Sequence, residues 1–296
     1  IIYKSAWFKK ILYKASMKGK TLWRTLSNIW IALAAGQAIF AVFFLSANII
    51  KFIQPGGRGS PILPILPGLT IRIYWLPYIL IAFAIAIITH EGAHGIIARV
   101  EGINIESAGI ALALIFPAGF VEPNEKEFEA APLTSRLRVL AAGSSTNLIC
   151  GFITFLLLSS LFTSTSSGIV IVEVLEGGPL YKAGLQRWDV IYSINGTRIN
   201  SPIDLSRYMA DVSPGSTLIL GTSRGERIII SAGVIDNETG KKRAIIGILP
   251  PFMEYHPSLL GLGPAADIHL YLTCLLYTSD AADEGLGVDL GGRRII

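Results

Sequence analysis

The feature that most constrains this chain is a long apolar run with a polar motif inside it. From Tyr74 to Val100 the sequence reads YWLPYILIAFAIAIITHEGAHGIIARV. A helix of about 20 apolar residues is long enough to cross the hydrocarbon core of a bilayer. Ionisable side chains are expensive at that depth, so where they occur they usually mark a functional site. The run therefore predicts a membrane-spanning helix that carries a site.

The polar motif is HExxH, formed by residues 90–94. On a helix, His90 and His94 are one turn apart and project from the same face. Two imidazoles in this arrangement can hold a zinc ion (Zn2+), which takes nitrogen ligands at about 2.0–2.1 Å. Glu91 lies beside them, where its carboxylate can take a proton from water at the metal. The motif predicts His90 and His94 as metal ligands and Glu91 as the catalytic base.

The composition fits a chain that is partly embedded in a membrane. Hydrophobic residues make up 51% of it and charged residues only 16%, which is unlike a soluble domain. The formal net charge is +4, but the basic residues crowd near the N-terminus and do not alternate with aromatic residues on a polar face. They predict an inside-positive membrane topology and no nucleic-acid partner. Two cysteines, Cys150 and Cys274, exclude a disulfide framework.

Residues 1–27 carry seven Lys or Arg and no acidic residue. They predict a basic amphipathic helix at the membrane interface, with the N-terminus in the cytoplasm. Residues 28–50 form the first predicted span. A Pro/Gly-rich link over 54–68 would then lie outside the cytoplasm, so the HExxH turn of the second span falls toward its cytoplasmic end.

Two further segments belong to the membrane part. Residues 108–121 are apolar but too short to cross, and Pro117 and Gly119 interrupt them. They predict a re-entrant strand or hairpin, whose part 108–116 could offer an edge to an extended substrate. Residues 139–162 form the third predicted span. Asn147 in that span either bonds neighbouring helices together or lines the active site.

After a Ser/Thr-rich linker, residues 167–250 alternate short β-branched runs with Gly, Pro and Asn turns. They predict a small soluble β-rich domain. The pieces GPLYKAGL (178–185), DVI (189–191) and NG (195–196) resemble a PDZ domain of the permuted type found in bacterial and archaeal proteases. Trp188 departs from that pattern, which usually has Gly before the Asp. A PDZ-like domain binds extended peptides by strand addition, and by topology this one would be extracytoplasmic.

The motifs together resemble the site-2 protease family of intramembrane zinc metalloproteases, in its archaeal and eukaryotic branch. The resemblance rests on HEGAH, AGIALALIFPAGFVEP, RLRVLAAGSSTN and the PDZ-like insertion, and covers Tyr74 to Leu272. It implies that His90 and His94 bind zinc, that Glu91 activates water, and that Asn147 matches an Asn often found in this helix. It also implies membrane-spanning protein substrates and a third zinc ligand, an Asp in an LDG motif of a later span.

The C-terminal region departs from the family pattern. Residues 251–272 read as the start of a returning span, and no LDG motif follows. Residues 273–296 resemble translated sequencing-adapter read-through, so we interpret them as a non-native tail. Asp267 and His269 could serve as zinc ligands in principle, but we expect them at a membrane interface. The chain is therefore expected to be an incomplete enzyme.

The sequence thus predicts a polytopic α-helical membrane protein with a re-entrant β segment and an inserted soluble PDZ-like α/β domain. Residues 28–162 form the first part of a transmembrane metalloprotease core, and the lipid bilayer is an expected partner. One alternative is a catalytically inactive membrane adaptor that binds peptide tails through its PDZ-like domain. Another is a metal-binding transporter, which would not need the base that HExxH supplies.

Overall fold

The computed structural model of the chain describes residues 2–54, 59, 66, 68–113, 116–235 and 242–282. These divide into two compact units. The first comprises the residues up to Leu156 together with 273–282, and the second is Leu157–Leu272. Most of the predicted Pro/Gly-rich link over 54–68 lies outside the described residues, as do residues 283–296.

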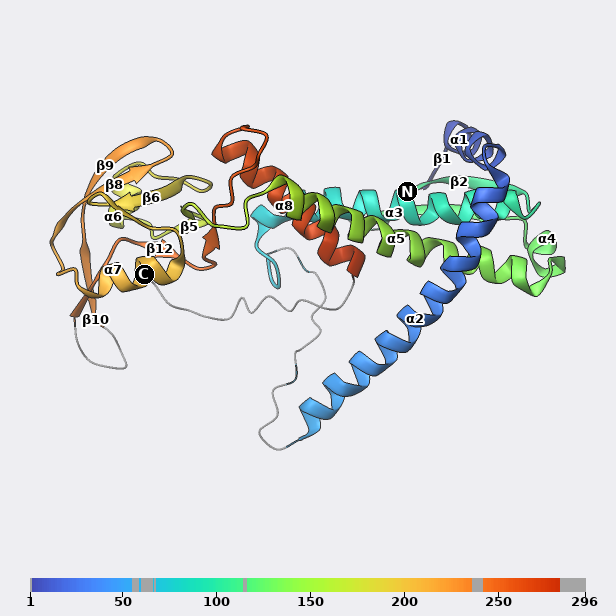
Figure 1. The fold of residues 1–296 in the computed structure, drawn as a ribbon, viewed down its shortest axis with the longest axis horizontal. Coiled ribbons are helices and arrows are strands. Elements are labelled where there is room, and N and C mark those ends of the chain that lie inside the picture. The colour runs from blue at the N-terminus through green and yellow to red at the C-terminus, as the bar shows by residue number, and fades with distance from the viewer. Residues whose placement is uncertain are drawn as a thin grey trace. The chain divides into compact units, whose positions relative to one another are not determined.

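Three helices of the described chain are long and apolar enough to cross a membrane (Figure 1). They are α2 (Lys20–Ile53), α3 (Leu76–Val100), preceded by the short 3-10 turn η1 (Ile73–Trp75), and α5 (Leu133–Leu161). The expected spans are present, and α2 and α5 begin eight and six residues earlier than the predicted 28 and 139. On α2 the apolar side chains of Ile39 and Phe43 are 72% and 70% exposed, as expected for a helix surface that faces lipid.

The basic N-terminal segment is divided into several elements. It begins with strand β1 (Ile2–Lys4) and helix α1 (Ala6–Met17). Ser5 caps α1, because its side chain accepts a hydrogen bond from the Phe8 N–H at 3.2 Å. Gly19, at φ +71°, then turns the chain into α2. The expectation of one interfacial helix over residues 1–27 is therefore wrong, since α2 already includes the last eight of them.

The re-entrant segment is a β-hairpin that packs on α3. Strands β2 (Ile105–Ala113) and β3 (Phe116–Pro123) pair antiparallel, and β1 adds to the other edge of β2. Gly109 allows this addition, because a Cβ there would collide with the Tyr3 carbonyl group. The central strand is therefore β2, and β1 occupies the edge that the sequence predicted for a substrate at residues 109–111; residues 114–115 of that prediction lie outside the described residues. In the part of the chain that the structure describes, no strand pairs with the other side of β3, and helix α4 (Glu125–Ala130) follows it.

The helices of the first unit meet through small and apolar residues. Trp30 of α2, Ile97 of α3 and Ala142 of α5 belong to one buried cluster. Gly95 brings α1 onto α3, because a Cβ there would lie only 2.7 Å from Leu12. Close packing at such positions is what allows α3 to place its polar motif against neighbouring backbone.

The second unit is rich in short strands around a buried aliphatic core that includes Ile169, Ile191 and Leu220. Its main sheet has the order β13-β4-β6-β8-β9, with β7 paired to β6, and two smaller pairs are β10-β11 and β12-β5. The elements are β4 (Ile169–Val170), β5 (Glu173–Val174), α6 (Pro179–Lys182), β6 (Val190–Ile194), β7 (Thr197–Arg198), α7 (Pro202–Ala210), β8 (Thr217–Thr222), β9 (Gly225–Ile230), β10 (Ala232–Ile235), β11 (Lys242–Ile245), β12 (Ile248–Leu249) and β13 (Met253–Glu254). The expected β-rich region is present, and its PDZ-like nature remains a prediction.

The departure at Trp188 has a clear structural consequence. Trp188 adopts φ +72°, a left-handed conformation that favours Gly and costs other residues roughly 1–2 kcal/mol. The turn is held by its neighbours: the Trp188 N–H bonds to the Ile171 carbonyl at 2.7 Å, and buried Asp189 forms an ion pair with Arg224 at 2.7 Å. The backbone thus keeps the turn that Gly would favour.

The last element, α8 (Pro264–Ala282), continues ten residues past Leu272. The predicted start of a returning segment over 251–272 therefore contains the start of a helix. In the second unit, the buried Asp267 near the start of α8 accepts hydrogen bonds from Tyr255, at 2.8 Å, and from Ser258. These bonds join the helix to the segment that connects it to β13.

Candidate metal centre

The two motif histidines lie side by side on α3. Their Nε2 atoms are 3.1 Å apart, and the ring planes cross at 73°. A tetrahedral zinc ion with ligands at about 2.0–2.1 Å would hold two nitrogens about 3.3–3.4 Å apart. The pair is therefore already close to the spacing that one shared metal ion requires.

The second ring nitrogen of His94 is fixed by α5. His94 Nδ1 lies 2.6 Å from the Val139 carbonyl oxygen. A carbonyl can only accept, so Nδ1 carries the hydrogen and the Nε2 lone pair is left for a metal. This arrangement of a ligand histidine bonded through its other nitrogen is typical of metal sites.

The second ring nitrogen of His90 meets Asn147, also on α5. The Asn147 side-chain nitrogen is assigned 3.4 Å from His90 Nδ1, and its oxygen accepts from the Thr89 hydroxyl at 3.1 Å. Exchanging the assigned amide oxygen and nitrogen gives an equally compact network, in which the Asn147 oxygen accepts from His90 Nδ1–H. In that form both histidines turn an Nε2 lone pair toward each other, and Asn147 contacts His90 as well as Thr89.

Gly143 leaves the space beside the two Nε2 atoms open. A Cβ built at Gly143 would lie 2.5 Å from His90 Nε2 and closer still to His94 Nε2. A side chain of any size would fill the plane that is equidistant from both nitrogens, which is where a shared ion has to lie. The donor types, their spacing and this open space fit a zinc ion.

Glu91 points from α3 to the hairpin. Its Oε2 accepts a hydrogen bond from the Val121 N–H of β3 at 2.9 Å. Gly119 permits this approach, because a Cβ there would be 3.2 Å from Glu91 Cγ and would overlap Ile87. The hairpin therefore fixes the orientation of the carboxylate that the sequence assigns as the base.

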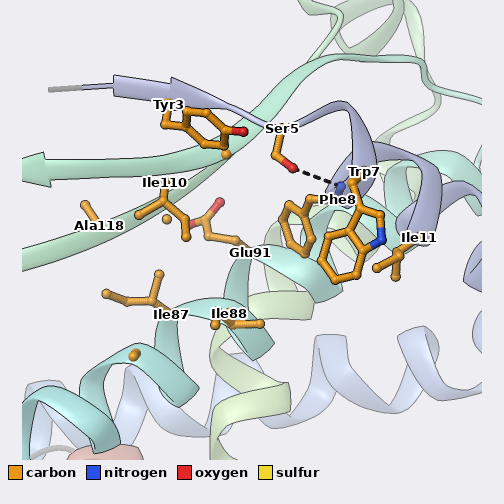
Figure 2. A pocket seen from close by; sticks show the side chains of 13 residues that line it. Tyr3, Ser5, Trp7, Phe8, Ile11, Ile87, Ile88, Glu91, Ile110 and Ala118 are labelled. Atoms are coloured by element: carbon orange, nitrogen blue, oxygen red, sulfur yellow. Dashed lines mark hydrogen bonds between the residues drawn. The ribbon is translucent and has the colours of Figure 1, made fainter.

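An apolar cavity of about 440 Å³ adjoins Glu91. Figure 2 shows Glu91 between α3 and the hairpin, with Phe8 and Trp7 of α1 on one side of it and Ile110 on another. The volume falls in the range of about 300–1,000 Å³ that is usual for ligand sites, and a few polar side chains in an apolar wall, here Tyr3, Ser5 and Glu91, are their usual composition.

A third protein ligand is not among the described residues. No group of three or more His, Cys, Asp or Glu in that part of the chain lies close enough to hold a metal. Asp267 uses both carboxylate oxygens within the second unit, for Tyr255 and Ser258. His269 makes a ring contact with Trp188 in the same unit, with centroids 5.9 Å apart.

Three contributors to the site carry no motif of their own. Val121 and Val139 act through the backbone, so their side-chain identities give no signal. Gly143 does give a signal in the sequence, because it lies four residues before Asn147 and therefore on the same face of α5. The stretch AAGSST predicted close helix packing, and its one glycine, Gly143, also opens the metal position.

A long apolar helix that presents two imidazoles and a carboxylate to neighbouring backbone is the arrangement of a membrane-embedded, metal-dependent hydrolase. The chain belongs to peptidase family M50, whose family model matches residues 78–273. M50 is a family of metalloproteases, so the resemblance to site-2 proteases drawn from the motifs is confirmed.

The chain is similar to proteins from distant organisms. It is 31% identical over 221 residues to an uncharacterized protein, MJ0971, of Methanocaldococcus jannaschii. The aligned residues cover 73% of this chain and 58% of that protein. It is 30% identical over 171 residues to the membrane-bound transcription factor site-2 protease homolog of Arabidopsis thaliana, or 53% of this chain and 33% of the relative. A probable periplasmic serine endoprotease, DegP-like, of Brucella suis matches 86 residues at 30% identity, 28% of this chain and 17% of its own length. The chain thus spans less than two thirds of each of these relatives.

Proposed function

We propose that this chain is part of an intramembrane zinc metalloprotease of the site-2 type, which cleaves membrane-spanning proteins. The observation that carries the proposal is the His90–His94 pair, with Nε2 atoms 3.1 Å apart on a helix long enough to span a bilayer. The relative in Arabidopsis thaliana is named as a site-2 protease homolog, which supports the same activity.

His90 and His94 would hold the zinc ion, and a further ligand would come from outside the described residues. Bound zinc supplies Lewis-acid polarisation of a peptide carbonyl and makes water more acidic. Val139 and Asn147 keep the two imidazoles in the tautomer and orientation that ligation needs. Both come from α5, so the packing of α5 on α3 is part of the site.

Glu91 acts as the base that takes a proton from the attacking water and later returns it to the leaving amine. Its Oε2 is held by the Val121 N–H, and its Oε1 has no hydrogen-bond partner within the described part of the chain. One oxygen thus orients the group while the other stays available for proton transfer.

The substrate has to unwind before cleavage, because a helical peptide bond is enclosed by its own hydrogen bonds. Among the described residues no strand pairs with the outer edge of β3, and its Val121 N–H contacts Glu91, so an extended substrate segment would pair along this edge beside Glu91 by strand addition. The 440 Å³ cavity beside Glu91 would take an apolar side chain of that segment.

The topology follows from charge. Because Lys and Arg precede α2 without acidic residues, we place the N-terminus in the cytoplasm and the β-rich second unit outside it. If that unit is PDZ-like, its ligand is an extended peptide bound at a strand edge. A single cysteine introduced at exposed Arg207 should then react with an impermeant thiol reagent added outside intact cells.

The test of the activity is Glu91→Gln in a full-length version reconstituted with zinc in vesicles together with a membrane-spanning reporter. We expect zinc to stay bound and cleavage to fall by several orders of magnitude, because Gln cannot accept the proton. The matched control is Glu125→Gln, which removes an exposed carboxylate from α4. Undiminished cleavage by Glu91→Gln would remove Glu91 from the proposed role.

The second candidate is a catalytically inactive adaptor, and the lack of a third ligand among the described residues favours it. If the protein is an adaptor, its peptide binding should be unchanged by His90→Ala and by His94→Ala. The unsubstituted full-length adaptor should also bind zinc no better than those two variants. If the full-length protein binds about one zinc ion per chain and both variants lose it, the result supports the metalloprotease.

A further inference from the structure

A second cavity, of about 490 Å³, lies at the C-terminal end of α3 in the first unit. Three cationic side chains line it: Lys9 and Lys10 of α1, and Arg99 of α3. Tyr13 and Asn104 complete its polar wall. The cavity is separate from the one beside Glu91, with which it shares no lining residue.

Arg99 is held in place but is not satisfied. Its guanidinium carbon lies 5.1 Å from the centre of the Tyr13 ring, and its NH1 donates to the Asn104 side chain. Its Nε is buried and has no hydrogen-bond partner among the described residues. A buried charged donor without an acceptor is costly, and an anion bound beside the guanidinium in the cavity would offset part of that cost.

The lysines leave further positive charge unpaired. Lys9 donates to the Glu106 backbone carbonyl at 3.3 Å, which orders its amine without neutralising it. Lys10 is exposed and has no hydrogen-bond or ion-pair partner within the described chain. The cavity therefore offers donors with a positive excess to an anion.

The nearby carboxylates that the structure describes do not pair with the two lysines. Glu127 accepts from the Asn104 backbone and side chain, at 2.5 and 2.8 Å, and it lies close enough to Arg99 for the two charges to interact. Glu106 accepts from Asn124 at 2.7 Å. Neither carboxylate forms an ion pair with Lys9 or Lys10 in the described chain, so the positive charge of the two lysines remains available.

The helix that carries the lysines has the character of an interfacial helix. Trp7 and Met17 of α1 are 72% and 66% exposed, and no acidic residue precedes Ser27. Apolar side chains beside lysines on a helix next to a membrane span are expected to lie at the level of the lipid headgroups. The anion that is abundant at that level is the phosphate of a phospholipid.

We propose that the cavity formed by Lys9, Lys10, Arg99 and Tyr13 binds the phosphate of an anionic phospholipid headgroup. The guanidinium supplies oriented donors, Tyr13 fixes its plane, and the two lysines supply charge. This contact would fix α1 against the C-terminal end of α3, where Arg99 lies five residues after His94 of the metal centre. The site is independent of whether the chain cleaves peptides.

The test uses the purified full chain in a zwitterionic detergent, titrated with phosphatidylglycerol and read by native mass spectrometry. We expect Arg99→Gln and Lys10→Gln each to weaken lipid binding about fivefold or more, the factor typical of one basic group at an anionic lipid surface. The control is Lys14→Gln, which removes the same charge from an exposed position of α1 that does not line the cavity.

Lys10→Gln keeps the test valid if Arg99→Gln impairs folding, because Lys10 is exposed and its removal breaks no contact in the described chain. Equal losses in Lys10→Gln and Lys14→Gln would overturn the proposal in favour of diffuse attraction. Displacement of the lipid by millimolar inorganic phosphate would also overturn it, since the ligand would then be free phosphate. The lipid site is supported if Lys10→Gln and Arg99→Gln weaken lipid binding more than Lys14→Gln does, and if inorganic phosphate does not displace the lipid.

Discussion

The sharpest test of the metal centre is Gly143→Ala, which adds one methyl group. The new Cβ would lie 2.5 Å from His90 Nε2 and closer to His94 Nε2. Non-bonded heavy atoms are comfortable at about 3.5–4.0 Å, so each imidazole would have to withdraw by about an ångström or more. The methyl also occupies the plane equidistant from the two nitrogens, where a shared ion must lie.

The imidazoles have little room to withdraw. His94 is tied to the Val139 carbonyl at 2.6 Å, and Val139 and Gly143 belong to the same helix, so moving His94 away from the methyl stretches that bond. Removing a residue that only supports a ligand typically costs 10–100-fold in metal affinity. Displacing both ligands should cost at least about 100-fold, which corresponds to about 2.7 kcal/mol of binding free energy.

Zinc affinity can be measured by competition with a chelating indicator, and folding by thermal unfolding of the same sample. The control is Gly36→Ala in α2, where a Cβ would have no atom within 4 Å. Ala is favoured over Gly in a helix by up to about 1 kcal/mol, so this control should fold at least as well as the parent and bind zinc equally. If Gly143→Ala binds zinc as tightly as Gly36→Ala, the ion is not held by the His90–His94 pair.

The remaining predictions concern the supports of the two units. Asn147→Ala should weaken zinc binding about tenfold or more in the same chelator assay, and unchanged affinity would make the Asn147 contact only structural. Burial alone raises the pKa of the Glu101 carboxyl, but the Ser135 hydroxyl and Arg138 outweigh burial and lower it. Glu101 thus stabilises the fold above the unfolded pKa of about 4.3, and this contribution disappears as the pH falls through the lower folded value. Glu101→Gln should therefore reduce the unfolding temperature at pH 7 and make no difference at strongly acidic pH. Tyr255→Phe removes a donor to the buried Asp267 and should destabilise the second unit by about 1–3 kcal/mol, seen as faster proteolysis; an unchanged rate would show that Ser258 alone satisfies the carboxyl group.

The sequence predicted the parts of the fold that a pattern encodes directly. The run from Tyr74 to Val100 is apolar, long and free of internal Pro after Pro77, so its helix was predictable almost to the residue. The hairpin was predictable from a segment too short to span, with Pro117 and Gly119 inside it. The pairing of β1 with β2 was not, because a three-residue strand has no periodicity of its own and its partner lies about a hundred residues away.

The site shows the same division between side-chain and backbone information. His90, Glu91 and His94 are readable because the HExxH spacing itself places them on one helical face. What makes them a usable site lies in the Val139 carbonyl and the Val121 N–H, which any residue except Pro at position 121 would provide. The apolar helix can hold three polar side chains because α5 and the hairpin bring backbone and amide groups to them as hydrogen-bond partners. A substitution outside the motif, such as Gly143→Ala, whose methyl group would press on both imidazoles, should therefore damage the metal site as much as the loss of a ligand.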